Sequence, residues 1–244
     1  MPAAAFFDLD RTLISRATPI ALARSFHKHR LVRRRDLLRA ALWQLIFVVR
    51  GVGEREMRRA AEDGMLLLRG VPVAAVDELL AEAMETVLRP LVYREPVDLV
   101  HQHRSRGERV YLVSASLQQI VERIADDLGF DGAVGSTCEV EDGVYTGRSL
   151  QPCYGSLKAD RLREISQRED IDLAHSTAYS DSHTDLAFLE AVGHPVAVNP
   201  DRRLQDIAAS RGWPVLRFTE FLVPRSSAPR RPRLPRVPVR LWSK

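Results

Sequence analysis

The sequence predicts an α/β fold in which a parallel sheet is interrupted by a helical insert after its first strand. Three observations predict it: a short apolar run near the N-terminus, a long helical region after it, and strands that alternate with helices from residue 97 onward. Strands that alternate with helices pair in parallel, because each helix carries the chain back across the sheet. The 244 residues, 45% of them apolar, suffice for one substantial core with a smaller appended unit.

The first strand is predicted over residues 3–7, where a continuous apolar run is typical of a parallel strand buried on both faces. It ends in the stretch AFFDLDRTLIS, which places Asp8, Asp10, Arg11 and Thr12 directly after the strand. We expect Thr12 to bond locally to the backbone. Two carboxylates and a cation would be unfavourable in a hydrophobic core, so these side chains are candidates for a ligand site.

The helical insert is predicted over residues 15–90. Its apolar residues recur at helical spacing in segments separated by glycines, and no strand-like alternation interrupts them. The segments lie at about residues 19–30, 35–49, 55–70 and 75–89.

The chain from residue 91 to 223, together with residues 1–14, is predicted to form the α/β body. The segment CEVEDGVYTG alternates about Asp142 and Gly143, a strong signal for a hairpin. Further strands are predicted at residues 109–113, 177–180, 195–198 and 215–218, and helices at 97–106, 117–128, 157–167, 184–191 and 203–211.

The C-terminal tail, residues 224–244, is predicted to be extended and disordered, because prolines and arginines alternate in it. It carries a charge of +7 and no acid, so the rest of the chain carries −3 of the net +4. Such a basic patch suits an anionic membrane surface as a peripheral partner. We expect no specific nucleic acid partner, and the sequence leaves the oligomeric state open.

The two cysteines and the N-terminus exclude several classes of protein. Cys138 and Cys153 form no C-x-x-C pair, so neither a disulfide framework nor a zinc signature is present. The first residues lack the basic region of a signal peptide, and Asp8 interrupts their apolar run. We therefore expect a cytoplasmic protein.

Polar side chains follow each predicted strand at the edge where an open α/β sheet binds its ligands. They are Asp8, Asp10 and Thr12 after the first strand, Ser114 and Ser116 after the second, Lys158 at a helix start, and Asp181 and Asp185 after a later strand. Carboxylates a few ångströms apart repel one another unless a cation lies between them. Mg²⁺ prefers oxygen ligands, and no His or Cys stands among these residues to favour zinc.

The same residues resemble four motifs of the haloacid dehalogenase superfamily. DLDRT fits its D-x-D-x-T motif, YLVSAS its strand-then-serine motif, Lys158 its lysine motif and SDSHTD its D-x-x-x-D motif, over roughly residues 3–220. The helical insert is similar to the cap of subclass IB, which contains the phosphoserine phosphatases. The resemblance implies a Rossmann-like three-layer core with a parallel sheet, formed by residues 1–14 and 91–223, and a helical cap at 15–90.

The resemblance also implies a mechanism. Asp8 would attack phosphorus to form an aspartyl-phosphate, and Asp10 would protonate the leaving oxygen and then activate water. Asp8, Asp181 and the Asp10 carbonyl would hold Mg²⁺, with Lys158 as a second cation. Asp185 would orient Lys158 or complete the metal's outer shell.

Phosphate binding is assigned by the same resemblance to Ser114, to backbone N–H groups near Ala115 and to Lys158. In the insert, Arg55 is a candidate for binding a substrate carboxylate or second phosphate, because arginine suits bidentate anions. Phosphoserine phosphatases of this subclass carry a glutamate shortly after the first motif, where this chain has Ala17 and no acid before Asp36. A phosphoamino acid is therefore not the expected substrate.

The sequence leaves three functions open. The first is a Mg²⁺-dependent phosphatase acting on a small or lipid-derived anionic phosphomonoester. The second is a non-hydrolytic module that binds phosphate and docks to membrane or nucleic acid through its basic tail. The third is a phosphotransferase of the same fold.

Overall fold

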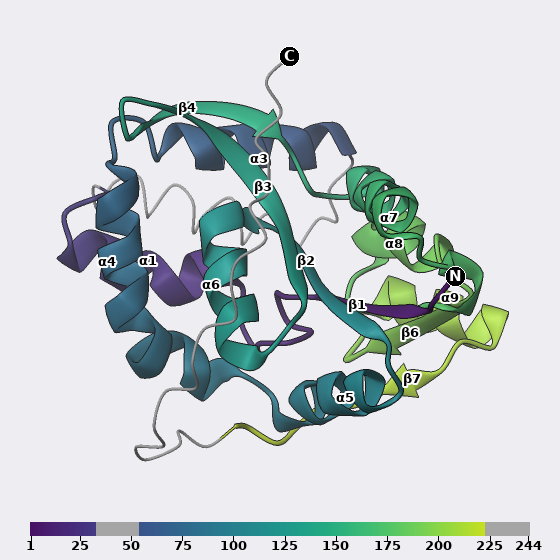
Figure 1. Ribbon diagram of the computed structural model, residues 1–244. Coiled ribbons are helices and arrows are strands. Elements are labelled where there is room, and N and C mark those ends of the chain that lie inside the picture. Colours follow the sequence, from purple (N-terminus) through teal and green to yellow (C-terminus); the bar gives the residue numbers. More distant parts are fainter. Residues whose placement is uncertain (33–53, 223–244) are drawn as a thin grey trace.

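One sheet organises the α/β body (Figure 1). The computed structural model describes residues 1–32 and 54–222, and within them seven strands run in the order β4-β3-β2-β1-β5-β6-β7. Every neighbouring pair is parallel except β3 and β4. The strands are β1 Ala4–Asp8, β2 Arg109–Leu117, β3 Gly132–Glu141, β4 Val144–Gln151, β5 Thr177–Ser180, β6 His194–Val198 and β7 Val215–Leu216. The predicted α/β class and the largely parallel sheet are confirmed.

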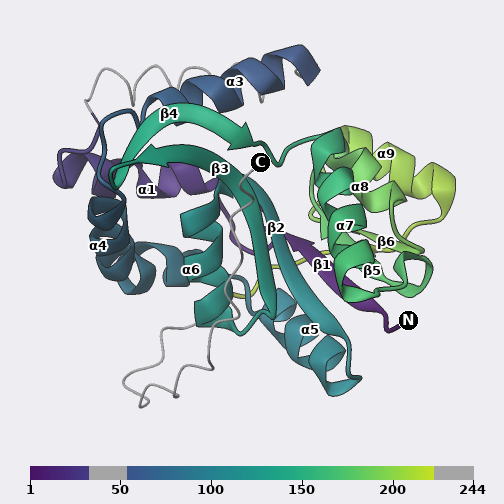
Figure 2. The same ribbon diagram turned by 45° about the horizontal axis from the view of Figure 1, so that its top comes forward.

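The central strand β1 is buried on both faces, as its continuous apolar run predicts. Successive side chains of a strand point to opposite faces, so Ala4 and Phe6 join one hydrophobic cluster and Ala5 and Phe7 join another. Figure 2 shows the helices that cover these two faces. The first cluster lies against α7 Ser156–Glu169, α8 Leu186–Glu190 and α9 Arg202–Arg211, and the second against α5 Arg94–Ser105 and α6 Gln118–Leu128.

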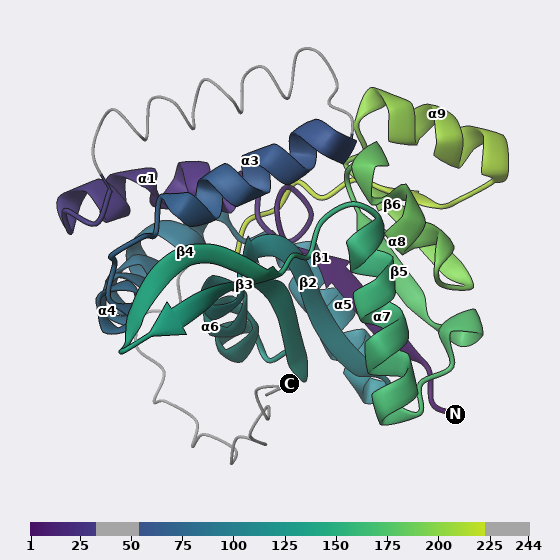
Figure 3. The ribbon, with the colours of Figure 1, turned by 90° about the horizontal axis from the view of Figure 1, so that it is seen from above.

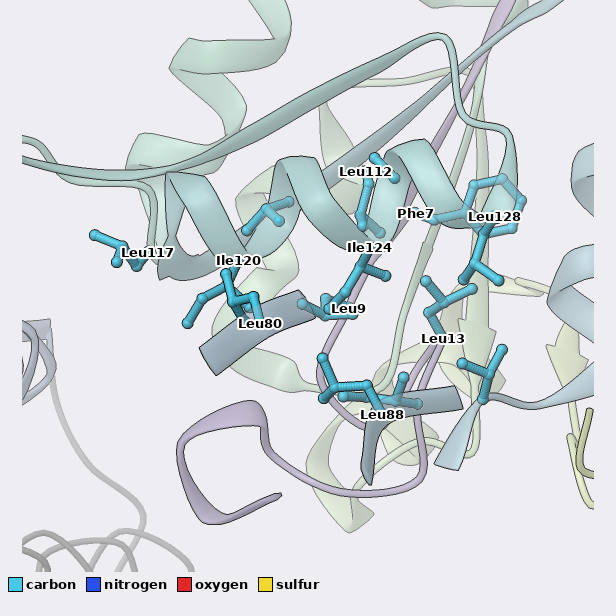
Figure 4. Packing of buried hydrophobic residues seen from close by; sticks show 14 of the residues in the cluster. Phe7, Leu9, Leu13, Leu80, Leu88, Leu112, Leu117, Ile120, Ile124 and Leu128 are labelled. Carbon is cyan, nitrogen blue, oxygen red and sulfur yellow. The ribbon is translucent and has the colours of Figure 1, made fainter. Parts of the chain in front are cut away.

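The predicted insert is helical in its described residues. It contains α1 Thr18–Lys28, α3 Glu54–Leu66 and α4 Val73–Ala83, followed by a π-helical turn Met84–Leu88 and a 3-10 turn Arg89–Leu91. Leu80 and Leu88 of the insert lie in the same cluster as Ile120 and Ile124 of α6 (Figure 4). The helix predicted at 35–49 lies outside the described residues, and the division into core and cap stays a prediction.

The hairpin of β3 and β4 confirms the predicted turn. Asp142 and Gly143 have φ of 49° and 77°, the left-handed values that a two-residue hairpin turn needs. The hairpin reaches the insert, where Figure 3 shows α3 alongside β4. There the Gly70 N–H donates to the Tyr145 carbonyl over 2.9 Å, and the Tyr145 N–H donates to the Val71 carbonyl over 2.9 Å. The insert is therefore anchored to an edge of the sheet.

The two ends of the insert lie side by side. The Ser15 N–H donates to the Leu91 carbonyl over 2.9 Å, and the Tyr93 N–H donates to the Leu13 carbonyl over 3.0 Å. The last described residue pairs with the same segment, because the Leu222 N–H donates to the Val92 carbonyl over 2.8 Å.

Some predicted boundaries were wrong by a few residues. Strand β2 extends to Leu117 through an irregular register with β3, beyond the predicted end at 113, and β7 stops at Leu216 instead of 218. The helix predicted at 184–191 begins as the 3-10 turn His183–Asp185. The tail 224–244, with its predicted membrane contact, lies outside the described residues. Within the described residues, no helix has both the length and the apolar character to cross a membrane.

Candidate active site

The ends of β1 and β5 bring two acidic loops to one edge of the sheet. The two strands pair in parallel with Phe7 opposite Tyr179, so Asp8 ends one strand beside the end of the other. Asp181 follows β5 directly. Both carboxylates are buried, with 4% and 5% of each residue exposed, although they lie 173 positions apart in the chain. Parallel pairing alone therefore accounts for the approach of the first and last motifs.

Lys158 links two of the acids. It is the third residue of α7 and 3% exposed. Its Nζ lies 2.5 Å from Asp8 Oδ1 and 2.7 Å from Asp185 Oδ2. The Ser180 hydroxyl, at the end of β5, donates to the same Asp185 oxygen over 2.7 Å. Asp185 therefore orients Lys158 against Asp8. We call Asp8, Asp10, Lys158, Asp181 and Asp185 the strand-tip cluster.

Burial and mutual repulsion disfavour the ionised acids. Burial raises the pKa of Asp8 to about 7, against the attraction of Lys158 and with the help of Asp185 and Asp10. Burial also raises the pKa of Asp181 well above its ordinary value, and the charges of Asp8 and Asp185 add to the rise. For Lys158, burial alone would lower the pKa, but Asp185 and Asp8 outweigh it and raise the pKa. The lysine therefore stays charged, and full ionisation of the acids would leave a surplus of negative charge that one lysine cannot balance.

This surplus suits a hard cation. The strand-tip cluster holds four carboxylates and one lysine. Among the described residues, no group of three or more His, Cys, Asp or Glu side chains is arranged so that it could hold a metal ion. Such a site fits an ion that is bound by one or two carboxylates and keeps several waters, and it does not fit a closed zinc site.

Asp10 points toward the insert. Its Oδ1 accepts a hydrogen bond from the Thr18 N–H over 2.6 Å and another from the Thr18 hydroxyl. Its Oδ2 lies 3.4 Å from the Ser116 hydroxyl. Burial raises the pKa of Asp10, while the two hydrogen bonds from Thr18 oppose the rise. The carboxyl is thus held by groups from the first helix of the insert and from the end of β2.

The other predicted substrate contacts lie at the end of β2 and in α3. Ser114 is buried, and its Oγ accepts a hydrogen bond from the Ser116 N–H over 3.1 Å. Ala115 is exposed. Arg55 lies in the first turn of α3. The predicted contacts of Ser114, Ala115 and Arg55 with substrate stay predictions.

Sequence reasoning missed two partners of the cluster and misjudged a third residue. The role of Thr18 becomes visible only in the folded structure, because its contact with Asp10 joins a loop to the start of a helix eight positions later. Ser180 was read only as a strand residue, although a polar residue at a strand end was the signal used for Ser114. Thr12 was expected to bond to the backbone, but its buried Oγ1 has no partner among the described residues.

Comparison with known proteins identifies relatives over most of the chain. A model of haloacid dehalogenase-like hydrolases matches residues 5–190. A probable phosphatase of Mycobacterium tuberculosis is 42% identical over 216 residues, which cover 88% of this chain and 75% of that protein. A phosphoserine phosphatase of the same organism is 31% identical over 220 residues, covering 89% and 71%. An inhibition of morphological differentiation protein of Streptomyces azureus is 39% identical over 237 residues, covering 95% and 86%.

A solved structure shares the fold. It is a phosphoserine phosphatase captured with an analogue of its phospho-aspartyl intermediate, and it superposes with a TM-score of 0.64 at 19% identity. The match covers 91% of this chain and 95% of that one. The likeness includes the α/β sheet with its flanking helices, and so supports the predicted fold.

Proposed function

The chain belongs to the haloacid dehalogenase-like hydrolase family and is a phosphatase, and we propose that it hydrolyses a small anionic phosphomonoester through an aspartyl-phosphate on Asp8. The observation that carries this proposal is the buried contact of Lys158 with Asp8 and Asp185. A lysine held by two acids at the end of the central strand supplies positive charge where a phosphoryl group would meet the nucleophile.

Asp8 is the proposed nucleophile. One of its oxygens is bound to Lys158, which fixes the direction of the carboxylate. A nucleophile held in one orientation reacts faster, because less orientational entropy is lost on reaching the transition state. Asp185 acts through Lys158, since the carboxylate and the Ser180 hydroxyl hold the ammonium group in place.

Asp10 is the proposed general acid and base. Burial raises its pKa, which favours the protonated form that a general acid needs. It lies two residues after Asp8 on the same loop, between the end of β1 and the first helix of the insert. It would protonate the leaving oxygen and then take a proton from the water that cleaves the intermediate.

Mg²⁺ is the proposed cofactor. The side chains of Asp8 and Asp181 and the carbonyl of Asp10 are the groups that we assign to it, and Asp185 lies on the other side of Lys158. When bound, the ion would offset the repulsion between a carboxylate and an anionic phosphate. The high pKa of Asp181 supports this assignment, because its buried charge needs compensation.

The substrate class is inferred from the family and from the insert. A relative that is 31% identical is named a phosphoserine phosphatase, which supports a small phosphomonoester. The start of the insert nevertheless has Ala17 where such enzymes carry a glutamate for the substrate ammonium, and this position is buried here. We therefore propose an anionic ester that lacks an ammonium group, with Ser114 and the backbone near Ala115 holding the phosphoryl oxygens and Arg55 meeting a further anionic group.

The test is hydrolysis of p-nitrophenyl phosphate with and without Mg²⁺. We expect turnover that requires the ion, and a loss of at least ~10³-fold in Asp8→Asn. Asp206→Asn is the matched control, because Asp206 is an exposed aspartate on α9. Equal rates for Asp8→Asn and the unaltered protein would refute the nucleophile.

A screen of phosphate esters with the same variants tests the substrate class. Phosphoserine, glycerol phosphate, histidinol phosphate and lysophosphatidate differ in charge and in apolar content. A strong preference for phosphoserine would contradict the argument from Ala17. Release of the leaving alcohol only when an alcohol acceptor is added, with little inorganic phosphate formed, would favour a phosphotransferase. No turnover of any ester would favour a binding module.

A further inference from the structure

We propose that Thr18 is a positioning residue that holds the Asp10 carboxyl so that its transferable proton lies on Oδ2. The inference rests on the proposed function, because it takes Asp10 as the general acid. It goes further in assigning different tasks to the two oxygens of that carboxyl, and in giving the first helix of the insert a part in proton transfer.

The two Asp10 oxygens have different partners. Oδ1 accepts two hydrogen bonds from one residue, from the N–H of Thr18 over 2.6 Å and from its hydroxyl. Among the described residues, Oδ2 has only the Ser116 hydroxyl at 3.4 Å, beyond the range of a strong hydrogen bond. A backbone N–H only donates, so it requires an acceptor at Oδ1. A proton on the carboxyl is therefore directed to Oδ2.

Thr18 is itself firmly placed. It is fully buried and is the first residue of α1, followed by Pro19. The residue before the helix, Ala17, has no side chain that could accept a hydrogen bond from the free N–H groups of the first turn. Asp10 accepts one of these N–H groups, as a capping residue does, although it lies eight positions before Thr18. The helix start therefore fixes Oδ1, and Oδ2 is left for chemistry.

Proton transfer follows from this placement. In the first step an Asp8 oxygen bonds to phosphorus, the bond from phosphorus to the ester oxygen breaks, and the proton on Asp10 Oδ2 passes to that oxygen, which takes the electron pair. In the second step Asp10 removes a proton from water, whose oxygen bonds to phosphorus. The bond between phosphorus and Asp8 then breaks, which restores the Asp8 carboxylate and releases inorganic phosphate.

Esters with different leaving groups separate positioning from simple support of the fold. A primary alkoxide is a strong base that leaves only when protonated, whereas p-nitrophenolate is a stable anion that leaves without a proton. A residue that positions the general acid should therefore matter for an alkyl phosphate and much less for p-nitrophenyl phosphate. A residue that only supports the fold would affect both esters alike.

The experiment compares kcat/KM for glycerol phosphate and p-nitrophenyl phosphate in Thr18→Val and Thr18→Ser. Valine keeps the shape and loses the hydroxyl, so we expect a loss of about 10- to 100-fold on glycerol phosphate and a much smaller one on p-nitrophenyl phosphate. Serine keeps the hydroxyl and should restore most of the loss. Thr86→Val is the matched control, because the exposed Thr86 hydroxyl donates to the backbone carbonyl of Glu82, four residues before it, and lies outside the strand-tip cluster. Circular dichroism and thermal melting of each variant test folding, and Thr18→Ala replaces Thr18→Val if valine prevents folding.

Asp10→Asn, measured on the same two esters, separates this inference from the proposed function. If the loss of kcat/KM in Asp10→Asn depends on the leaving group and Thr18→Val lowers both rates equally, Thr18 is structural. The inference is then overturned while the proposed function stands. If Asp10→Asn also lowers both rates equally, the general acid has been assigned wrongly and both fail. If the unaltered protein hydrolyses neither ester, nor any other in the screen, the proposed function fails and the inference fails with it.

Discussion

Two polar networks are contacted by consecutive residues of β1, Phe7 and Asp8. Asp8 belongs to the strand-tip cluster with Lys158, whereas Phe7 packs on a second network made of His103, Glu108 and Tyr179. The ring centroids of Phe7 and Tyr179 are 4.3 Å apart. In this second network, His103 Nδ1 lies 2.6 Å from Glu108 Oε2 and its Nε2 lies 2.8 Å from the Tyr179 hydroxyl.

The networks differ in whether their polar and charged groups have matching partners. In the histidine network, each ring nitrogen of His103 has one partner, so its donors and acceptors are matched. In the strand-tip cluster, a single lysine stands against four carboxylates, and Asp181 has no ion pair among the described residues. A matched network supports a fold without help, whereas unbalanced buried charge raises pKa values and marks a candidate site for a ligand.

The largest effect on stability is expected from removing the one cation of the strand-tip cluster. Lys158→Met leaves Asp8 and Asp185 buried without a cation beside them, which should lower the free energy of unfolding by about 3–5 kcal/mol in urea titrations. Lys28→Met is the control, because it breaks an exposed ion pair with Glu82 and should change stability little. Equal effects of the two variants would show that the cluster depends less on Lys158 than its geometry indicates.

Added Mg²⁺ should sharpen the contrast between the networks. At a concentration of ~100 Kd the ion should stabilise the unaltered protein by about 2.7 kcal/mol, measured by thermal melting. Asp181→Asn should lose most of this gain and, without the ion, should be at least as stable as the unaltered protein, because one of the repelling acids is gone. Asp206→Asn should keep the full gain. An undiminished response of Asp181→Asn would place the ion elsewhere.

The pH dependence of stability without metal should reveal the raised pKa of Asp8. A carboxyl whose folded pKa is raised stabilises the fold at low pH, and that contribution is lost as pH rises from the ordinary value of 3.8 through about 7. The raised pKa values of Asp10 and Asp181 act in the same direction. In EDTA, the stability of the unaltered protein relative to Asp8→Asn should therefore fall between pH 4 and pH 8. A difference that rises with pH would contradict the assignment.

The smallest effect is expected in the histidine network. Tyr179→Phe removes one hydroxyl and leaves a ring nitrogen of His103 without its partner, which should lower the free energy of unfolding by about 1–2 kcal/mol. Urea titrations with and without Mg²⁺ should give the same loss, since none of the groups that we assign to the ion belongs to this network. A loss that depends on Mg²⁺ would show that the two networks are coupled.

Features with a local cause were predictable from the sequence. The turn at Asp142 and Gly143 is fixed by two residues that accept left-handed backbone, and most strands and helices of the body lie within a few residues of their predicted ranges. Strand β3 is an exception, since it begins at Gly132, six residues before the predicted hairpin segment. The approach of Asp8 and Asp181 was predictable too, because parallel strands deliver their ends to one edge.

Features that depend on distant partners were not predictable. Strand β2 continues past Val113 only because β3 pairs with it again at Leu117. The burial of His103 against Tyr179 depends on how a helix and a strand far apart in the chain pack together, which the sequence does not show. The contact of Thr18 with Asp10 joins two elements whose relative position is set by tertiary packing.

The backbone hydrogen bonds that join residues 13–15 to 91–93 have an evolutionary consequence. Because the chain leaves the α/β body and returns to it between hydrogen-bonded neighbours, the intervening helices can be exchanged without rerouting any strand of the body. A lineage could therefore acquire a new specificity by recombination at two adjacent splice points, provided that the new segment again places a donor such as Thr18 against Asp10.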